Sequence, residues 1–363
     1  MTKYSNTRAT LAIAKASLKS ILRSPSAVVF SLAFPLVFIV VFANIGGAGI
    51  SVDVGVVKGS DTINPIYRAL KNVNVVHMVQ DQPYDEMSKD LAKGRIDAIL
   101  NIKKNNGPTP YTVDVQYTKA SLEKGNILKS VINNIFYIFN KPKNQGPPPV
   151  AELRETTVQG REYKYIDFIL PGQLGFSLLS SGVFGTAFVF ISLRLTLVIK
   201  RFFATPVKRY SIILGEALAR ISFSLMGALF IIVVGHYVFD FTLINGIVTV
   251  LNMLLLSAMG LIIFMGFGFT ISGIAKNEST VPPLANIITL PQFLLSGTFF
   301  PVTSFPKWLQ YISNALPLTH LNDAMRKVAF EGAGLGDVTH QLFILAIWFV
   351  IVYAVAIKTF KWE

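Results

Sequence analysis

The feature that most constrains this sequence is a series of long apolar runs. Each run is roughly 20 residues long, the length that a helix needs to cross about 30 Å of hydrocarbon, and a soluble core needs no run of that length. Only 15% of the 363 residues are charged and 52% are hydrophobic. Soluble domains are usually about 25% charged. The runs and the composition both indicate an integral membrane protein.

We predict about six transmembrane helices. The first occupies 27–47, and we interpret it as a retained anchor because no small-residue cleavage site follows it. The other spans are expected at 165–193, 211–239, 243–272, 281–300 and 340–357. Together they make 165–363 a membrane domain with five spans. Prolines interrupt its semi-polar segment at 301–338, for which we expect short helices at the outer membrane surface.

Residues 1–26 predict a cytoplasmic amphipathic helix in the headgroup layer, because they are basic and contain no acid. Its apolar and basic faces follow helical spacing: Leu11, Ala14, Leu18, Ile21 and Leu22 on one, Lys15, Lys19 and Arg23 on the other. An ordinary solvated flank is the alternative. Ser24 and Pro25 end this helix before the first span.

Residues 48–164 differ in character, because charges of both signs appear and strand patterns alternate with helical ones. Strands are expected at 52–58, 73–79, 96–102 and 111–118, and helices at 63–71, 84–93 and 119–139. This alternation predicts an inserted α/β domain. The Pro-rich stretch 141–149 is typical of a stiff linker or loop.

Orientation follows from Lys and Arg in the short loops, which concentrate on the cytoplasmic side of a membrane. The amino terminus, the connection at 194–209 and the carboxyl tail are basic, whereas the turn at 236–245 has no Lys or Arg. We therefore expect both termini in the cytoplasm and the α/β domain outside. The net charge of +13 could also indicate nucleic-acid binding, but this asymmetry favours the membrane explanation and predicts no nucleic-acid partner.

Several kinds of chemistry are not expected. The absence of cysteine excludes disulfides and thiolate sites. No Gly-Lys dipeptide occurs, so the phosphate-binding loop of ATPases is absent. The four histidines lack a second ligand at metal-binding spacing. We therefore predict no catalytic residue, no metal and no cofactor in this chain.

Charges within spans are costly, so each suggests a function. Glu216 and Arg220 are four residues apart and predict an ion pair in the third span, with either a functional or a purely structural role. Asp167 begins the second span, where we expect it at the outer interface. Because such sparse charge argues against proton- or ion-coupled transport, a transporter of this kind needs a separate source of energy.

Three stretches in order suggest a family. They are Asp167–Gly172 (DFILPG); Ala204–Arg209 (ATPVKR) with Leu214–Glu216 (LGE); and Leu295–Pro301 (LSGTFFP) followed by Leu316–His320 (LPLTH) and Arg326. The third contains an outer motif of Gly297, Pro301, Pro317, His320 and Arg326. With these stretches the chain resembles the type-2 permeases of ATP-binding-cassette exporters, in the subgroup with a large extracytoplasmic domain between the first two spans. The likeness covers nearly the whole chain in architecture and 167–327 in motifs.

The resemblance implies a homodimer or heterodimer of permease chains, with separate cytoplasmic ATPase subunits that hold ATP and magnesium. It also implies a coupling helix between the second and third spans and a second ATPase contact at the amino-terminal helix. The candidate coupling residues are Lys200, Arg201, Phe202, Phe203, Thr205 and Pro206. The alternative is that this loop lies among lipid headgroups. The family often has an Arg-Glu element here, whereas 194–201 contain no acid, so the docking chemistry differs.

We therefore expect a permease subunit of an ATP-driven exporter in a bacterial or archaeal cell membrane. The sparse charge of the spans favours an amphipathic or hydrophobic cargo entering from the bilayer. One alternative is a membrane-anchored receptor or scaffold whose outer domain binds a partner. Another is a membrane-embedded enzyme, which would need a convergent set of titratable residues.

Overall fold

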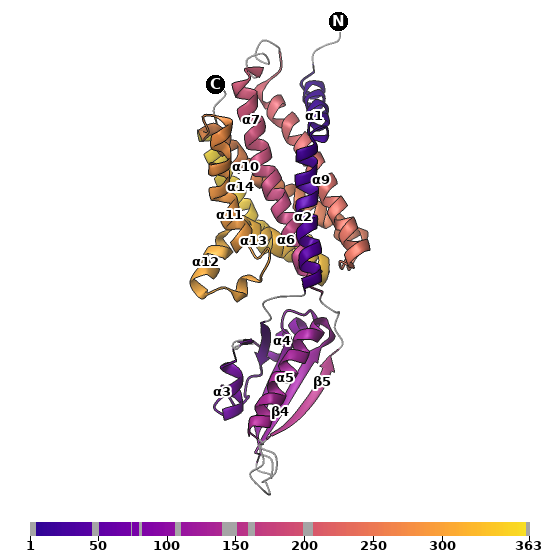
Figure 1. Ribbon diagram of the computed structural model, residues 1–363, viewed down its shortest axis with the longest axis vertical. Helices are drawn as coiled ribbons and strands as arrows, with labels where there is room; N and C mark the ends of the chain where they lie inside the picture. The colour runs from indigo at the N-terminus through magenta and orange to yellow at the C-terminus, as the bar shows by residue number, and fades with distance from the viewer. Residues whose placement is uncertain are drawn as a thin grey trace. The chain divides into compact units, whose positions relative to one another are not determined.

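The computed structural model describes residues 5–45, 51–73, 75–79, 82–105, 110–139, 151–158, 164–198 and 206–360. The chain forms two compact units (Figure 1). One combines Met1–Gly46 with Tyr165–Glu363, and the other is Gly47–Lys164.

The first unit is a helical bundle. Its helices are α1 (Asn6–Leu22), α2 (Pro25–Ile45), α6 (Tyr165–Ser180), α7 (Thr186–Leu195), α9 (Arg209–Phe239), α10 (Ile247–Ile274), α11 (Val281–Leu295), α12 (Lys307–Ala315), α13 (Pro317–Arg326) and α14 (Thr339–Thr359). Ser181–Gly185 form a π-helical turn that joins α6 to α7, so that Tyr165–Leu195 are one continuous helical segment. Three 3-10 turns (Glu278–Thr280, Val302–Ser304, Leu335–Val338) and a second π turn (Lys327–Glu331) complete the unit's described elements.

Among the described residues, four helical segments are long and apolar enough to cross a membrane: Tyr165–Leu195, Arg209–Phe239, Ile247–Ile274 and Leu335–Thr359. The other two predicted spans correspond to α2, of which Ser31–Phe42 form a shorter apolar helix, and to α11. At 1.5 Å per residue, α11 is only about 22 Å long. It ends at Leu295 and not at residue 300 because Gly297, at a φ of 68°, turns the chain.

Helix α10 lies at the centre of the bundle, against α6, α7, α9, α13 and α14. Glycines allow its close approach to the π turn. A Cβ at Gly268 would lie 2.7 Å from the Val183 carbonyl oxygen, and one at Gly182 would lie 2.7 Å from the Cβ of Phe264. The bundle is thus closely packed where α6 passes into α7.

The two short helices of the 301–338 segment differ in burial. Helix α12 is exposed, with Trp308 67% and Tyr311 78% accessible. Helix α13 is enclosed by α6, α10 and α14, and its Leu318, Leu321 and Met325 are fully buried. The proline-interrupted sequence predicts short helices here, but its local pattern does not distinguish the enclosed helix from the exposed one.

The second unit is built on a five-stranded sheet in the order β2-β1-β3-β4-β5. The strands are β1 (Val52–Val56), β2 (Val76–Val79), β3 (Ala98–Lys104), β4 (Tyr111–Thr118) and β5 (Ala151–Val158). The β3–β4 pair is antiparallel and the other pairs are parallel. The helices are α3 (Pro65–Lys71), α4 (Tyr84–Ala92) and α5 (Leu122–Phe139).

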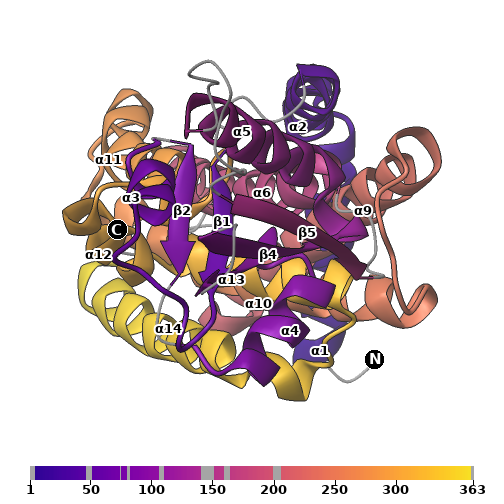
Figure 2. The same ribbon diagram turned by 90° about the horizontal axis from the view of Figure 1, so that it is seen from below.

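Helices cover both faces of this sheet (Figure 2). Alternating residues of β1, including Val52 and Val54, pack with α3 and α5. Met87 and Leu91 of α4 pack with Ile99 on the opposite face. The predicted strands and helices are present with shifted ends, whereas β5 was not predicted. It follows the Pro-rich stretch 141–149, which lies outside the described residues, and it pairs with β4 as an edge strand of the sheet.

Candidate functional site

The predicted coupling segment between α7 and α9 is described only at its edges. Lys200, Arg201, Phe202, Phe203 and Thr205 lie outside the described residues. Pro206 is described, and it lies in an exposed turn shortly before α9. The coupling role of these six residues therefore stays a prediction.

Helix α1 is docked along the first turns of α9, and the docking depends on Gly215. A Cβ at this position would lie 2.7 Å from Ile13 Cγ2 and 3.0 Å from the Thr10 carbonyl oxygen. Because a backbone oxygen cannot move aside as a flexible side chain can, a larger residue would separate the two helices. The Leu214–Glu216 stretch thus includes a close contact between α1 and α9.

The residue after this glycine connects the same two helices. The Ser17 hydroxyl of α1 donates a hydrogen bond to the Glu216 carboxylate of α9. Glu216 also lines a hollow of about 470 Å³ between α1 and α7, together with Phe188 and Glu278. A carboxylate within a predicted span is therefore part of a helix–helix contact near one end of the bundle.

Arg220 lies one turn further along α9 and is only 9% exposed. Its guanidinium donates to the Gly185 carbonyl oxygen at 2.9 Å and to the Ser181 carbonyl oxygen at 3.5 Å. Both carbonyls belong to the π turn, whose wider winding interrupts the regular helical hydrogen bonds. A Cβ at Gly185 would lie 1.9 Å from Arg220 Nη1, so the glycine makes room for the guanidinium.

Glu216 and Arg220, the predicted ion pair, are neighbours on α9, but each forms hydrogen bonds with a different element. Glu216 bonds to α1 and Arg220 to the π turn. An electrostatic attraction between the two stays a prediction. Through these hydrogen bonds, Glu216 connects α9 to α1, and Arg220 connects α9 to the π turn.

Asp167 lies in the first turn of α6, and its place at the outer membrane interface stays a prediction. Its side chain is fully buried in the first turn of α6. The carboxylate accepts hydrogen bonds from the Thr242 backbone N–H at 2.8 Å and the Thr242 hydroxyl at 3.2 Å. Its position at a helix amino terminus also stabilises the negative charge. Asp167 therefore ties α6 to the turn between α9 and α10.

The outer motif brings Gly297 and Arg326 together. The Arg326 guanidinium donates to the carbonyl oxygens of Phe168 and Gly297 and lies 3.7 Å from the centroid of the Phe168 ring. A Cβ at Gly172 would lie 2.6 Å from the Thr298 carbonyl oxygen, so the loop after α11 approaches α6 closely. Arg326 thus connects the first and third of the sequence stretches that suggested the family.

The remaining residues of the outer motif shape short turns and helices. Pro301 precedes the turn Val302–Ser304, and Pro317 is the first residue of α13. The His320 Nε2 bonds to the Asn314 carbonyl oxygen at 2.8 Å. Burial lowers the pKa of this imidazole, so its neutral form can donate that bond.

The partners of these charged groups could not be predicted from the sequence. Ser17 and Thr242 carry no sequence signal that sets them apart from other hydroxyl residues. The described residues contain no group of three or more His, Asp or Glu side chains that could hold a metal ion. The contacts of Glu216, Arg220 and Arg326 join different elements of the bundle.

Comparison with known proteins agrees with the sequence motifs. The profile of the ABC-2 family transporter proteins matches residues 25–358. The chain is 25% identical to ABC transporter G family member 20 of Dictyostelium discoideum over 58% of this chain and 28% of that protein. It is 19% identical to the Escherichia coli K12 protein named "Probable multidrug ABC transporter permease YbhR", over 66% of this chain and 64% of that protein.

A shorter match, 28% identical, is to Nodulation protein J of Neorhizobium galegae, over 27% of this chain and 37% of that protein. The chain spans less than two thirds of the length of each of these relatives. The family profile, by contrast, covers the membrane-capable helices and the segment between the first two predicted spans. On this match, the chain belongs to the ABC-2 family of transporter proteins.

Proposed function

We propose that this chain is the transmembrane permease subunit of an ATP-binding-cassette exporter. Two permease chains, identical or different, would form the pathway, and separate ATPase subunits holding ATP and magnesium would drive it. The cargo would be amphipathic or hydrophobic and would leave the cytoplasm or the inner leaflet. Six spans would cross a bacterial or archaeal cell membrane, with the 48–164 α/β domain outside and both termini in the cytoplasm.

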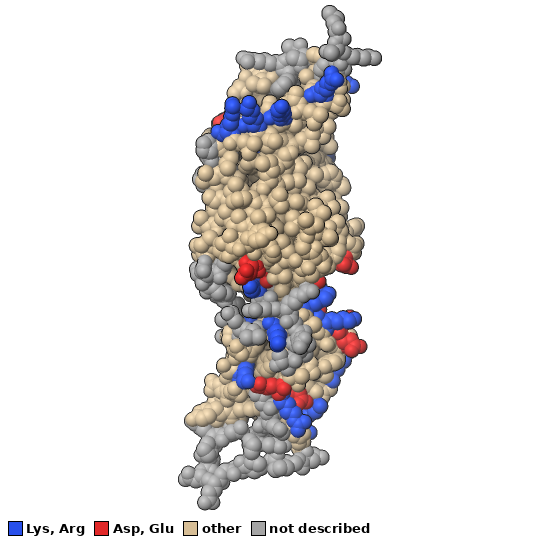
Figure 3. Space-filling model, turned by 90° about the vertical axis from the view of Figure 1, so that its right-hand side faces the viewer, with Lys and Arg blue, Asp and Glu red and all other residues tan. Residues whose placement is uncertain are grey.

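The observation that carries this proposal is the basic end of the helical bundle. Helices α1, α7, α10 and α14 end there, and α2, α9 and α11 begin there, beside Arg23, Arg194, Arg209, Lys276 and Lys358. Figure 3 shows Lys and Arg gathered at this end, followed by a band with almost no charge on the visible face. Since cytoplasmic loops carry the excess of Lys and Arg, this end would face the cytoplasm and the ATPase.

Two elements at this end would contact the ATPase. The connection between α7 and α9 is the predicted coupling segment, and α1 is docked on α9 directly beside the start of that helix. A displacement of either element would be transmitted to α9. Because Arg220 of α9 is hydrogen-bonded to the π turn, the displacement would also be transmitted to the junction of α6 and α7. This route supports a mechanical role for the permease, with the chemistry on its partner.

A row of phenylalanines supports an apolar cargo. Phe34 and Phe38 of α2, Phe176 of α6 and Phe293 of α11 have ring centroids 4.0–6.5 Å from their neighbours in the row. All four are only partly buried within this chain. Such a surface can receive a hydrophobic molecule or a second permease chain, and both fit the proposal.

The test is purification from native membranes. A cassette ATPase should co-purify with the chain, whereas the chain alone should hydrolyse no ATP above background. The double variant Arg201→Glu with Phe203→Ala should reduce co-purification and transport by tenfold or more, since truncating one energetic hot spot costs about 2 kcal/mol. The control is Lys93→Glu with Tyr84→Ala in the second unit, which should change neither. If no ATPase binds and the chain works alone, the receptor or scaffold hypothesis replaces the transporter.

A further inference from the structure

Docking on α9 fixes which side of α1 faces away from the bundle. Thr10 and Ile13 meet Gly215, and Ser17 bonds to Glu216, so these residues mark the face toward α9. At about 100° per residue, Lys15, Lys19 and Arg23 lie about 160–240° around the helix from Ser17. The cations therefore line the side opposite the docking contact, where all three are exposed.

This row of cations has no acidic neighbour in its own part of the chain. No Asp or Glu precedes Asp53 in the sequence. Among the described residues, none of the ion pairs includes Arg8, Lys15, Lys19 or Arg23. Like charges four residues apart on a helix repel each other. An anion bound between them would turn that repulsion into attraction.

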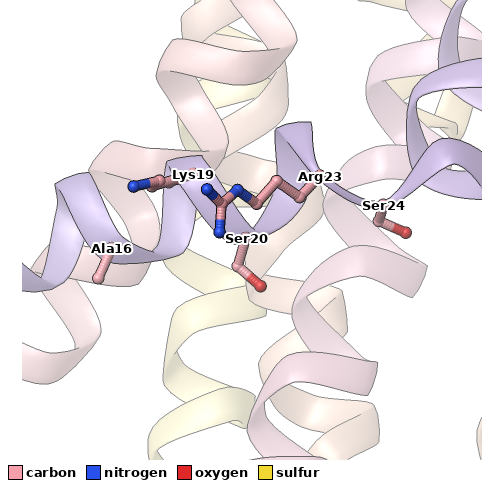
Figure 4. Close-up of a pocket in the computed structure, with 5 residues that line it drawn as sticks. All are labelled: Ala16, Lys19, Ser20, Arg23 and Ser24. Atoms are coloured by element: carbon pink, nitrogen blue, oxygen red, sulfur yellow. The ribbon is translucent and has the colours of Figure 1, made fainter.

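A hollow of about 510 Å³ lies at the carboxyl end of this row. It is lined by Ala16, Lys19, Ser20, Arg23 and Ser24 (Figure 4). In Figure 4 the Arg23 guanidinium turns back along the helix toward Lys19, above Ser20. Two cationic donors beside a hydroxyl suit a phosphate group, because guanidinium binds phosphate oxygens in pairs and ammonium adds a compact charge.

Apolar side chains next to the hollow indicate the source of the phosphate. Leu11 and Leu22 are 63% and 47% exposed, although they adjoin the basic row. The hollow ends at Ser24, one residue before α2, and Val29 on α2 is 56% exposed. Acyl chains would cover these leucines and Val29 while the headgroup occupied the hollow, which is the usual arrangement of a basic interfacial helix.

We propose that Lys19, Ser20 and Arg23 form a binding site for the phosphate of an anionic phospholipid. The lipid would lie at the end of the bundle that carries α1, with its acyl chains against Leu22 and α2. Because α1 also contacts α9 through Ser17, the bound lipid would hold α1 between the membrane surface and the bundle. The site lies on the same helix as one of the proposed ATPase contacts, but its test needs neither the ATPase nor transport.

The test uses the full chain in detergent, with native mass spectrometry measuring retained lipid. Dioleoylphosphatidylglycerol should be retained in preference to dioleoylphosphatidylcholine. The variant Lys19→Gln with Arg23→Gln should lose about thirty-fold in phosphatidylglycerol affinity, the effect expected of two cations near an anionic surface. The matched control, Arg8→Gln with Lys15→Gln, removes the same charge from the same helix but not from the hollow, and should lose at most about threefold.

Three outcomes would overturn the proposal. Equal losses in the two double variants would mean diffuse attraction along the helix without a site. Equal retention of both lipids by the wild type would mean that the headgroup charge is not recognised. Displacement of the lipid by millimolar glycerol 3-phosphate would assign the hollow to a soluble anion. Should the double variant fold poorly, Lys19→Arg with Arg23→Lys keeps both charges and should retain the lipid preference.

Discussion

At the residue scale, the charged side chains of the helical bundle serve as connections between backbones. Arg220 and Arg326 lie far apart in the sequence, yet each donates to carbonyl oxygens of the α6–α7 segment, at Gly185 and Phe168. Asp167 also binds a backbone group, but as an acceptor: its carboxylate accepts a hydrogen bond from the Thr242 N–H. Within hydrocarbon an unpaired backbone group is costly, so such a bond can stabilise an irregular turn.

Arg220 provides the prediction at this scale. Arg220→Met should destabilise the chain by about 1.5–3 kcal/mol, because hydrogen bonds to a charged donor are of that size and the π-turn carbonyls would lose theirs. Thermal unfolding in detergent would measure this as a lower Tm. Arg8→Met, at an exposed position of α1, is the control and should leave the Tm within about 1 °C. Equal effects of the two changes would show that Arg220 is not a structural connection.

At the element scale, the N-terminal helix is part of the bundle and not a free flank. Its position depends on the small residue Gly215, which lets α1 approach α9 closely. It also depends on the hydrogen bond from Ser17 to Glu216. The sequence predicted an apolar and a basic face for α1, in the headgroup layer, and no contact with another helix. The structure places α9 against Thr10, Ile13 and Ser17, which belong to neither predicted face, and α1 is therefore linked to the helix that follows the predicted coupling segment.

Gly215→Ala tests this docking. The new methyl group would lie 2.7 Å from Ile13 Cγ2 and 3.0 Å from a backbone oxygen, so α1 should move away from α9. We expect backbone amides of 10–22 to exchange hydrogen at least tenfold faster by mass spectrometry. Gly227→Ala is the matched control on the same helix, because its methyl would meet only the flexible end of Leu32, at 3.3 Å. Unchanged exchange in Gly215→Ala would contradict the docking.

At the scale of the whole molecule, the two units follow different packing rules. The bundle has long apolar helices whose exposed surface is itself apolar, as at Leu251 and Phe343. The 47–164 unit encloses its own core on both faces of a sheet, and most of its described charged side chains are exposed. This contrast is expected of one unit surrounded by lipid and another surrounded by water.

The proposed orientation can be checked with introduced cysteines, since the chain has none. Asp85→Cys lies on an exposed position of α4, and Ser279→Cys on the exposed turn between α10 and α11. An impermeant thiol reagent should label the first in intact cells and the second only after permeabilisation, because the basic end of the bundle should face the cytoplasm. The reverse pattern would invert the topology.

Local sequence patterns predicted the membrane class of this protein, its principal apolar segments and most strands of the second unit. Those features depend on hydropathy and periodicity within one helical turn or one strand. The tertiary structure was needed to establish that Asp167 is buried, that α11 ends at Leu295, and that β5 pairs with β4. It also decided that Glu216 bonds to Ser17, 199 positions away, and Arg220 to a π turn. The sequence shows that a buried charged side chain needs a hydrogen-bond partner. Which group becomes that partner depends on which distant part of the chain the fold places next to it.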